Sequence, residues 1–232
     1  MGAPAANQTV RPRQLALALG HEESLAREDF LEGPSNATAL TLIEAWPDWP
    51  APVVLLAGTE GSGKSHLAAI WAAASGARVM AGRALAETSP PAALATGALV
   101  IEDLVSGDFD EAVLFHMLNM AREEGAFILL TARTAPSSWQ VGLRDLASRL
   151  RVLPVATLDA PDDALLRSVI VKLCADRQLP VDEAVVGYVA NRIERSFAAA
   201  RAAVSLLDRE ALRQKRAVNR SLAAELFRPP GA

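Results

Sequence analysis

Cysteine, aromatic side chains and long apolar runs are scarce in this sequence. Cys174 is the single cysteine among 232 residues, which excludes an internal disulfide and a thiolate metal cage and favours a reducing compartment. The N-terminal segment lacks the apolar core of a signal peptide, and no apolar run reaches the roughly 18 residues of a transmembrane helix. The sequence therefore predicts a cytoplasmic protein without a membrane segment.

Basic charge is not in excess either. Lysine and arginine total 23 against 27 acidic residues, which gives a net charge of -4. This balance excludes a uniformly basic surface for duplex DNA, and we expect no direct sequence-specific DNA binding. By contrast, 51% of the residues are hydrophobic, which is enough for the core of one large domain or of a large and a small one.

Short apolar segments alternate with helical patterns over the first two thirds of the chain. One helix is expected to run from Asn36, as its N-cap, to Trp46, and others to cover 64–74 and 110–124. The segments expected as strands are 53–57, 78–81, 99–101, 127–131 and 152–158. Apolar strands that alternate with helices need crossover connections, so we predict an α/β fold with a parallel five-stranded sheet covered on both faces.

Strand patterns stop after residue 160. Helical patterns follow, and Pro161 suits the first turn of the first one. They cover 161–177, 182–191 and 197 to about 216, with a short apolar tail at 222–227. We expect the chain to divide into a flexible arm at 1–20, an α/β domain at 21–159 and a small all-helical domain at 160–232.

The segment GTEGSGKS at 58–65 matches the phosphate-binding P-loop at every fixed position, and it lies between an apolar strand and a helix. Its glycines let backbone N–H groups point at phosphate oxygens, and the helix that follows adds its positive end. Lys64 is expected to neutralise the β and γ phosphates, and the Ser65 hydroxyl to ligate Mg²⁺. A chance glycine-rich turn is the alternative, which both flanks disfavour. The residues expected in this site are Gly58, Gly61, Ser62, Gly63, Lys64 and Ser65.

Two adjacent acids, Glu102 and Asp103, end the third expected strand. Nucleotide hydrolysis needs a carboxylate that holds the metal with its water shell and a group that orients the attacking water. We assign Glu102 to the metal and both acids to catalysis. Two solvated acids at a strand end are the alternative interpretation.

The chain resembles the AAA+ ATPases of the DnaA branch, and within it the Hda family of short DnaA-related regulatory inactivators of replication initiation. The resemblance runs from about residue 14 to 227. Its most telling segments are FLEGPSN at 30–36, GTEGSGKSHL at 58–67, EAVLFHMLN at 111–119, DLASRL at 145–150 and LDREALRQKRAVNRSLAAELF at 207–227. It implies an AAA+ sheet of order 5-1-4-3-2 and a helical lid, with ADP or ATP and Mg²⁺ between them.

Further site residues follow from this resemblance. Arg149 matches the arginine finger, which a neighbouring subunit inserts to stabilise charge on the terminal phosphate and which is worth about 10³- to 10⁵-fold in rate. A helix-end arginine paired with Asp145 is the alternative. Asn36 lies in a segment that lines the adenine site in the family. His66, directly after the loop, is expected to pack or to hydrogen-bond beside the nucleotide.

The segment 14–19 resembles the family's motif for the sliding clamp of DNA polymerase III. In an extended peptide, alternate leucines project to one side and fit an apolar groove, while a glutamine amide can both donate and accept hydrogen bonds. An ordinary edge strand is the alternative. The residues expected to contact the clamp are Gln14, Leu15, Leu17 and Leu19.

Three departures from the family pattern bear on hydrolysis. The order Glu102 then Asp103 inverts the usual order, and a small misplacement of the attacking water can cost about 100-fold in rate. Arg133 stands where relatives carry an acid that senses the γ phosphate after the fourth strand, which weakens that role here, although Thr131 is a nearby polar substitute. Ala198 aligns with the family's sensing arginine, and Arg201, one helical turn further on, is expected to bind the nucleotide in its place. We therefore expect nucleotide binding with at most weak intrinsic ATPase activity.

The resemblance implies a regulator that binds the clamp, presents Arg149 to ATP held by DnaA and so stimulates its hydrolysis. DnaA, the clamp and further copies of this chain are the expected partners. The sequence ends after the lid pattern, where DnaA carries a DNA-binding domain, and this favours a regulator.

Two other functions remain open from the residues. One is an autonomous AAA+ ATPase that acts as a helicase loader or DNA-remodelling helper. The other is a single-stranded DNA binder, because eight basic residues against three acids lie between Arg192 and Arg220. A solvated helix face is the plainer interpretation of that segment, and the aromatic share of 5% leaves few rings for base stacking.

Overall fold

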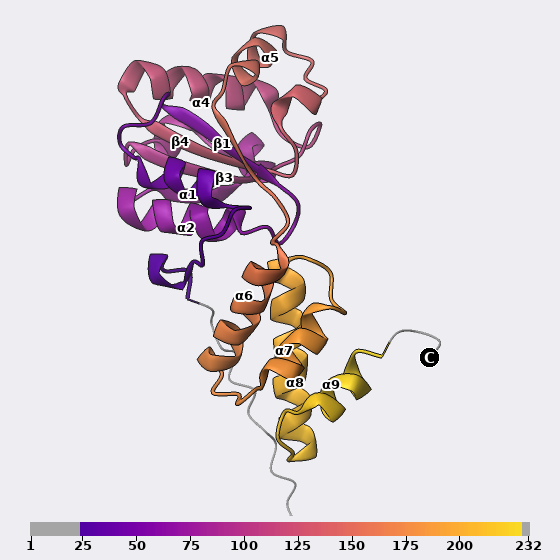
Figure 1. The fold of residues 1–232 in the computed structure, drawn as a ribbon. Helices are drawn as coiled ribbons and strands as arrows, with labels where there is room; N and C mark the ends of the chain where they lie inside the picture. Colours follow the sequence, from indigo (N-terminus) through magenta and orange to yellow (C-terminus); the bar gives the residue numbers. More distant parts are fainter. Residues whose placement is uncertain (1–23, 229–232) are drawn as a thin grey trace, which may run out of the picture.

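The structure, a computed structural model, describes residues 24–228 (Figure 1). An α/β part comes first and a bundle of four helices lies beside it (Figure 1). The elements of the α/β part are η1 (Arg27–Asp29), α1 (Ala37–Glu44), β1 (Val53–Gly58), α2 (Lys64–Ser75), β2 (Arg78–Ala81), η2 (Gly82–Glu87), α3 (Pro90–Ala93), β3 (Ala98–Leu104), α4 (Glu111–Glu124), β4 (Phe127–Ala132), η3 (Pro136–Ser138), α5 (Arg144–Arg151) and β5 (Val155–Leu158).

The five strands form one parallel sheet in the order β2-β3-β4-β1-β5. This confirms the predicted α/β fold and the strand order implied by the resemblance. Leu55 of β1 pairs with Leu130 of β4 on one side and with Val155 of β5 on the other. Because the strands are parallel, the carboxyl ends of β1, β3 and β4 meet at one edge, where ligands bind in open α/β sheets.

Side chains of β1 alternate between two cores, one on each face of the sheet. Val53 and Leu55 pack in the core covered by α3, α4 and α5, whereas Val54 and Leu56 pack in the core covered by α1 and α2. All six residues of β1 are buried. Burial on both faces explains why this strand is an unbroken apolar run in the sequence.

The helical bundle has a core of its own, separate from both faces of the sheet. Each of its helices begins after a residue whose side chain caps it. The capping side chain accepts a hydrogen bond from the backbone N–H three residues further on, which has no partner within the helix. The capping residues are Asp162, Asp182, Ser196 and Asn219. The helices are α6 (Asp163–Asp176), α7 (Glu183–Ala190), α8 (Phe197–Gln214) and α9 (Arg220–Leu226).

Several predicted boundaries are wrong for local reasons. The first bundle helix begins at Asp163 and not at Pro161, because Asp162 takes the capping position. The last strand begins at Val155 and not at Val152, because α5 extends to Arg151 and its closing turn occupies the next residues. Between β2 and β3 the short elements η2 and α3 were not predicted.

Within 24–228, no helix is long and apolar enough to cross a membrane.

Candidate functional site

The loop at 58–65 joins the end of β1 to the start of α2, as the sequence predicts. Gly61 and Gly63 adopt left-handed backbone conformations, with φ of 71° and 102°, which side chains disfavour. A Cβ atom on Gly58 would lie 2.6 Å from the carbonyl oxygen of Leu158 and 2.8 Å from Oγ of Ser62. The three glycines are therefore required by the path of the loop, and they bring its backbone N–H groups to the first turn of α2.

Lys64 lies inside this loop and is 6% exposed. Its Nζ donates to the carbonyl oxygens of Gly58 at 2.8 Å and Thr59 at 2.9 Å, and it forms no ion pair with any described carboxylate. Burial lowers the pKa of Lys64, and the nearby Asp103 charge acts in the opposite direction. Ser62 is 1% exposed, and its Oγ has no hydrogen-bond partner among the described residues. A buried cation beside an unpartnered hydroxyl fits the binding of an anion.

The two acids of β3 lie at the same edge of the sheet. Oε1 of Glu102 is buried and has no hydrogen-bond partner among residues 24–228. Asp103 is exposed and left-handed, with φ of 54°, and its backbone N–H donates to Oγ1 of Thr131 at 3.0 Å. The register between β3 and β4 shifts at this point. This bulge turns two successive acids into different environments, one half-buried and one in solvent.

The donor set fits a magnesium ion that keeps most of its water shell. No group of three or more potential metal-ligating side chains occurs in the described part of the chain. Mg²⁺ usually takes one or two protein oxygens and completes its shell with water and phosphate. The exposed Ser65 at the start of α2 and the half-buried Glu102 can supply those oxygens.

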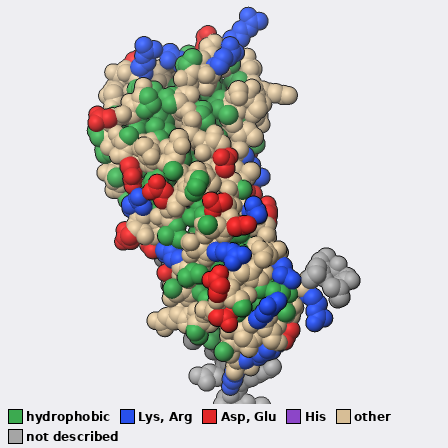
Figure 2. Space-filling view, viewed as in Figure 1, with side chains coloured by type: hydrophobic (Ala, Val, Ile, Leu, Met, Phe, Trp, Pro, Cys, Tyr) green, Lys and Arg blue, Asp and Glu red, His purple; other side chains and the backbone are tan. Residues whose placement is uncertain are grey.

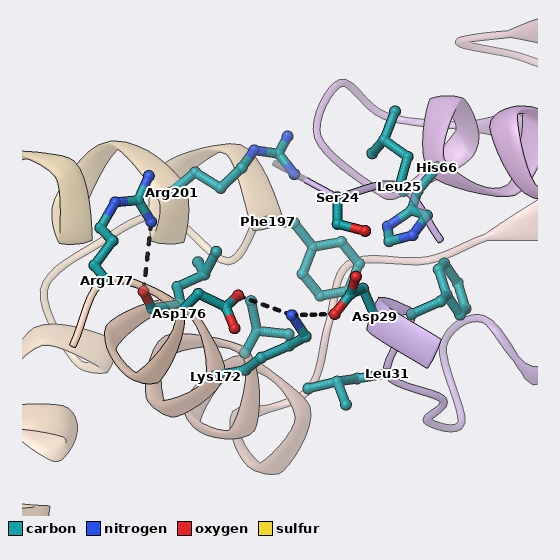
Figure 3. A pocket seen from close by; sticks show the side chains of 14 residues that line it. Ser24, Leu25, Asp29, Leu31, His66, Lys172, Asp176, Arg177, Phe197 and Arg201 are labelled. Carbon is teal, nitrogen blue, oxygen red and sulfur yellow. Dashed lines mark hydrogen bonds and ion pairs between the residues drawn. The ribbon is translucent and has the colours of Figure 1, made fainter. Parts of the chain in front are cut away.

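A cleft continues from the loop (Figure 3). Its walls come from the segment before α1, the first turn of α2, and helices α6 and α8. Gly63 and His66 line it, so the cleft opens directly beside the phosphate loop. The lining residues are Ser24, Leu25, Asp29, Phe30, Leu31, Gly63, His66, Val169, Lys172, Leu173, Asp176, Arg177, Phe197 and Arg201.

His66 and Asn36 take different positions relative to this cleft. His66 lines it, lies edge-on to Phe30 and donates from Nε2 to the carbonyl oxygen of Ala26 at 3.0 Å. Burial lowers the pKa of His66, although the bond to Ala26 acts in the opposite direction. Asn36 does not line the cleft, and its amide is bonded to the backbone of Gly33 and Leu31. Contrary to the prediction, its side chain does not cap α1.

Helix α8 rests on the phosphate loop. The backbone N–H of Phe197 donates to the carbonyl oxygen of Gly61 at 2.9 Å. A Cβ atom on Gly61 would lie only 2.7 Å from Cβ of Ala198. The small side chain of Ala198 thus permits direct contact between loop and bundle. Arg201, one turn further along α8, lines the cleft.

Three residues that line the cleft, Asp29, Lys172 and Asp176, form an ion-pair bridge (Figure 3). Nζ of Lys172 lies 2.7 Å from a carboxylate oxygen of Asp29 in η1 and 2.8 Å from one of Asp176 in α6. The hydrogen bond from Lys172 lowers the pKa of Asp29. Burial acts to lower the pKa of Lys172, but its bonds to Asp176 and Asp29 outweigh this and raise it. The bridge ties the α/β part to the bundle.

Arg149 lies on α5, away from the loop. Helix α5 is on the side of the α/β part far from α6 to α9, whereas the loop contacts α8 (Figure 1). The guanidinium of Arg149 is 5.4 Å from the ring centroid of Phe115 on α4, and Arg149 forms no ion pair with Asp145. One turn earlier on α4, Glu111 accepts the backbone N–H groups of Gly142 and Leu143, just before α5. Arg149 is thus held on the surface, separate from the loop of its own chain.

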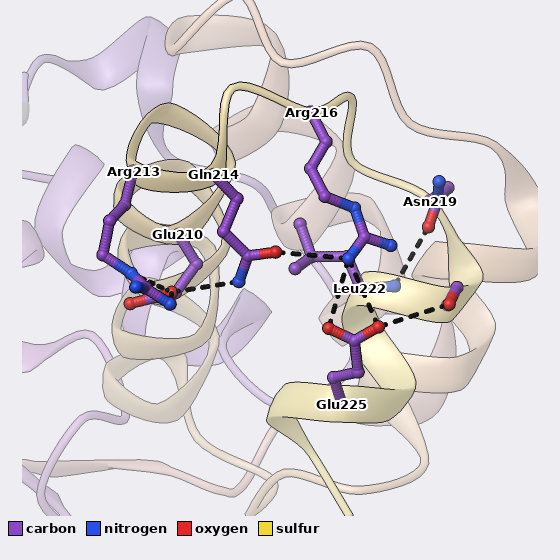
Figure 4. A network of polar contacts seen from close by, with 8 residues as sticks. Glu210, Arg213, Gln214, Arg216, Asn219, Leu222 and Glu225 are labelled. Carbon is purple, nitrogen blue, oxygen red and sulfur yellow. Dashed lines mark hydrogen bonds and ion pairs between the residues drawn. The ribbon is translucent and has the colours of Figure 1, made fainter.

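Part of the basic segment of the bundle is paired with acids. Arg195 pairs with Asp163. Arg213 pairs with Glu210 of α8, and Arg216 pairs with Glu225 of α9 (Figure 4). Acidic and basic side chains are interspersed over this part of the molecule in Figure 2. These contacts favour the solvated helix face that the sequence left open.

Some predicted residues cannot be placed, and some contacts were not predicted. Gln14, Leu15, Leu17 and Leu19 lie outside the described residues. Sequence reasoning missed the Lys172 bridge and an ion pair between Arg133 and Glu60, whose atoms lie 2.7 Å apart. Glu60 occupies a variable position of the loop pattern, so only the fold could reveal its partner.

The fold is similar to that of solved replication-initiation and branch-migration proteins. Domain III of the Thermotoga maritima replication initiation protein DnaA matches with a TM-score of 0.72 and 22% identity, over 88% of this chain and 98% of that chain. AMPPCP-bound DnaA from Aquifex aeolicus matches with a TM-score of 0.64 and 19% identity, over 81% and 67%.

The Thermotoga maritima RuvB Holliday junction branch migration motor has the same fold, with a TM-score of 0.67 and 19% identity over 87% of this chain and 70% of that chain. No protein-family model matches the chain, and no curated protein matches it in sequence. At these identities the likeness shows a shared fold.

Proposed function

We propose that this chain binds an adenine nucleotide with Mg²⁺ between the loop at 58–65 and the cleft beside it. The observation that carries this proposal is Lys64, a buried cation that, among the described residues, is bonded only to carbonyl oxygens, next to a cleft lined by its neighbours Gly63 and His66. The DnaA of Aquifex aeolicus has this fold and was solved with AMPPCP bound, which supports the same ligand class here.

In this proposal each residue of the site has one task. Lys64 turns from the carbonyl oxygens to the phosphates, and the N–H groups of the loop bind phosphate oxygens. Ser65 and Glu102 hold the metal, which screens phosphate charge. Arg201 and His66 line the nucleoside side of the cleft. Asp103, which is exposed, is the candidate group for orienting water.

We further propose that the protein is an Hda-like regulator of replication initiation in the cytoplasm. Arg149 lies apart from the loop of its own chain, so its guanidinium is available to a nucleotide held by a neighbouring subunit. Presented to ATP on DnaA, it would stabilise negative charge on the terminal phosphate and speed hydrolysis. Residues 1–20 act as the clamp-binding arm, 21–159 as the nucleotide domain and 160–232 as the lid, and copies of the chain associate around the nucleotide.

Turnover of DnaA-bound ATP, with and without this chain and with DNA-loaded clamp, tests the proposed regulator. We expect stimulation that is lost in Arg149→Ala, while the nucleotide affinity of the variant stays unchanged. Arg151→Ala, an exposed arginine at the end of the same helix, is the matched control and should keep stimulation. Equal stimulation by wild type and Arg149→Ala would refute the finger assignment.

A second candidate is an autonomous ATPase that loads a helicase or remodels DNA. The acids of β3 favour it, because the unpartnered Oε1 of Glu102 and the exposed Asp103 lie at the edge where hydrolysis would occur. It predicts appreciable turnover by the isolated chain that Lys64→Ala abolishes. If the isolated chain hydrolyses ATP too slowly to measure and still stimulates hydrolysis by DnaA, the result supports the regulator and contradicts the autonomous ATPase.

A further inference from the structure

Arg133 reaches the phosphate loop from the neighbouring strand. Ala57 of β1 pairs with Ala132 of β4, so Arg133 directly follows the residue opposite the end of β1. Its Nη2 lies 2.7 Å from Oε2 of Glu60, a residue inside the loop. Both side chains are exposed, at 66% for Arg133 and 76% for Glu60. The loop therefore carries its own carboxylate as the counter-ion of a cation at the sheet edge.

The charge of Arg133 acts on the same site as Lys64. After burial and the opposing effect of Asp103, the Arg133 charge is a further cause of the lowered pKa of Lys64. Two cations thus flank the loop with different partners: Lys64 is bonded to backbone carbonyl oxygens, and Arg133 is paired with Glu60. Neither arrangement is strong, because an exposed ion pair contributes little and carbonyl bonds can be exchanged for charged ones.

We propose that Arg133 is a second phosphate-binding cation and that Glu60 is its built-in competitor. The inference rests on the proposed nucleotide binding. A nucleoside triphosphate exchanges the Glu60 carboxylate for its terminal phosphate on the Arg133 guanidinium, whose planar fork can bind two phosphate oxygens. A diphosphate leaves the Arg133–Glu60 pair in place. The pair therefore sets the preference of the site for triphosphate over diphosphate.

The Glu60 side chain can move away from Arg133 without being buried beside the phosphate charge. Its side chain is mostly in water, so it can turn outward and remain solvated after the exchange. The energetic cost is the loss of one exposed ion pair, whereas the gain is a charge-assisted bond to a doubly charged phosphate group.

Calorimetric titration of four proteins with Mg-ATP and with Mg-ADP tests this exchange: wild type, Glu60→Gln, Arg133→Gln and the double variant. We expect Arg133→Gln to weaken ATP binding about tenfold while ADP binding changes little. Glu60→Gln should tighten ATP binding by about 2- to 5-fold, since the competitor is gone. In the Arg133→Gln background, Glu60→Gln should have little effect.

Glu183→Gln is the matched control, because Glu183 forms an exposed ion pair with Arg167 at 3.3 Å in the bundle. It removes one negative charge away from the loop and should leave both affinities unchanged. Equal tightening by Glu60→Gln in both backgrounds would reveal a long-range charge effect and overturn the exchange. Equal weakening of ATP and ADP by Arg133→Gln would overturn it as well. If none of the four proteins bound either nucleotide, the proposed function itself would fail, and this inference with it.

Discussion

Gly61→Ala is predicted to separate the helical bundle from the phosphate loop. The new Cβ atom would lie 2.7 Å from Cβ of Ala198 and 3.0 Å from its backbone N, distances at which something must move. Backbone strain at a φ of 71° adds to this clash. We expect about 1–2 kcal/mol from the left-handed conformation and about 1–3 kcal/mol from overpacking, so the free energy of unfolding should fall by about 2–5 kcal/mol.

Gly97→Ala provides the matched control for this prediction. Gly97 has a similar φ of 76°, but a Cβ atom there would meet nothing within 4 Å. The control therefore carries the strain without the clash, and the difference between the two variants isolates the contact between loop and α8. At roughly 2–4 °C per kcal/mol for a chain of this size, Gly61→Ala should melt about 2–12 °C below Gly97→Ala.

Thermal unfolding followed by circular dichroism measures this difference, and urea unfolding gives the free energies. Ala198→Gly should partly restore the Gly61→Ala variant, because it removes the opposing Cβ atom, although glycine in a helix costs about 1 kcal/mol. Equal melting temperatures for Gly61→Ala and Gly97→Ala would refute the reasoning, since they would mean that α8 does not press on the loop in solution.

Three further predictions concern the finger, the bridge and the arm. Phe115→Leu keeps apolar volume but removes the ring beneath Arg149, so stimulation of DnaA-bound ATP hydrolysis should fall about 2- to 5-fold, whereas Phe115→Tyr should retain it. Lys172→Met should lower the free energy of unfolding at pH 7 by up to about 1 kcal/mol in urea titrations. Because Lys172 lowers the pKa of Asp29 from 3.8, the deficit should shrink as the pH falls below 3.8, and a constant deficit down to pH 2 would contradict the bridge. Gln14→Ala combined with Leu17→Ala should abolish clamp pull-down without changing the melting temperature, and a large loss of stability would instead assign that segment to the core.

The sequence predicts those parts of the site that a continuous segment encodes. The apolar run of β1 is buried on both faces, and GTEGSGKS follows it directly, so strand, loop and helix could be predicted together. The acids of β3 could be placed at the same edge, because carboxyl ends of parallel strands coincide. The fifth strand was predicted three residues too long, because Val152 is apolar although it lies in a turn.

Contacts between distant segments could not be predicted. Asn36 suits an N-cap by residue type, but its amide bonds to Leu31 and Gly33, and nothing in the sequence ranks these competing bonds. The cleft forms only when the bundle packs against the segment that precedes α1. The contact between Lys172 and Asp29 depends on that packing. The pairing of Arg133 with Glu60 depends on the register of β4 against β1.

Calorimetric titration of the purified, nucleotide-free protein with ADP and ATP in the presence of Mg²⁺ tests the central claim most directly. Saturable binding of one nucleotide per chain is predicted, weakened about 10- to 100-fold by Lys64→Ala because a charged bond to phosphate is lost. Absence of binding by the wild-type protein, or equal affinity in the Lys64→Ala variant, would contradict the assignment of this loop as a nucleotide site.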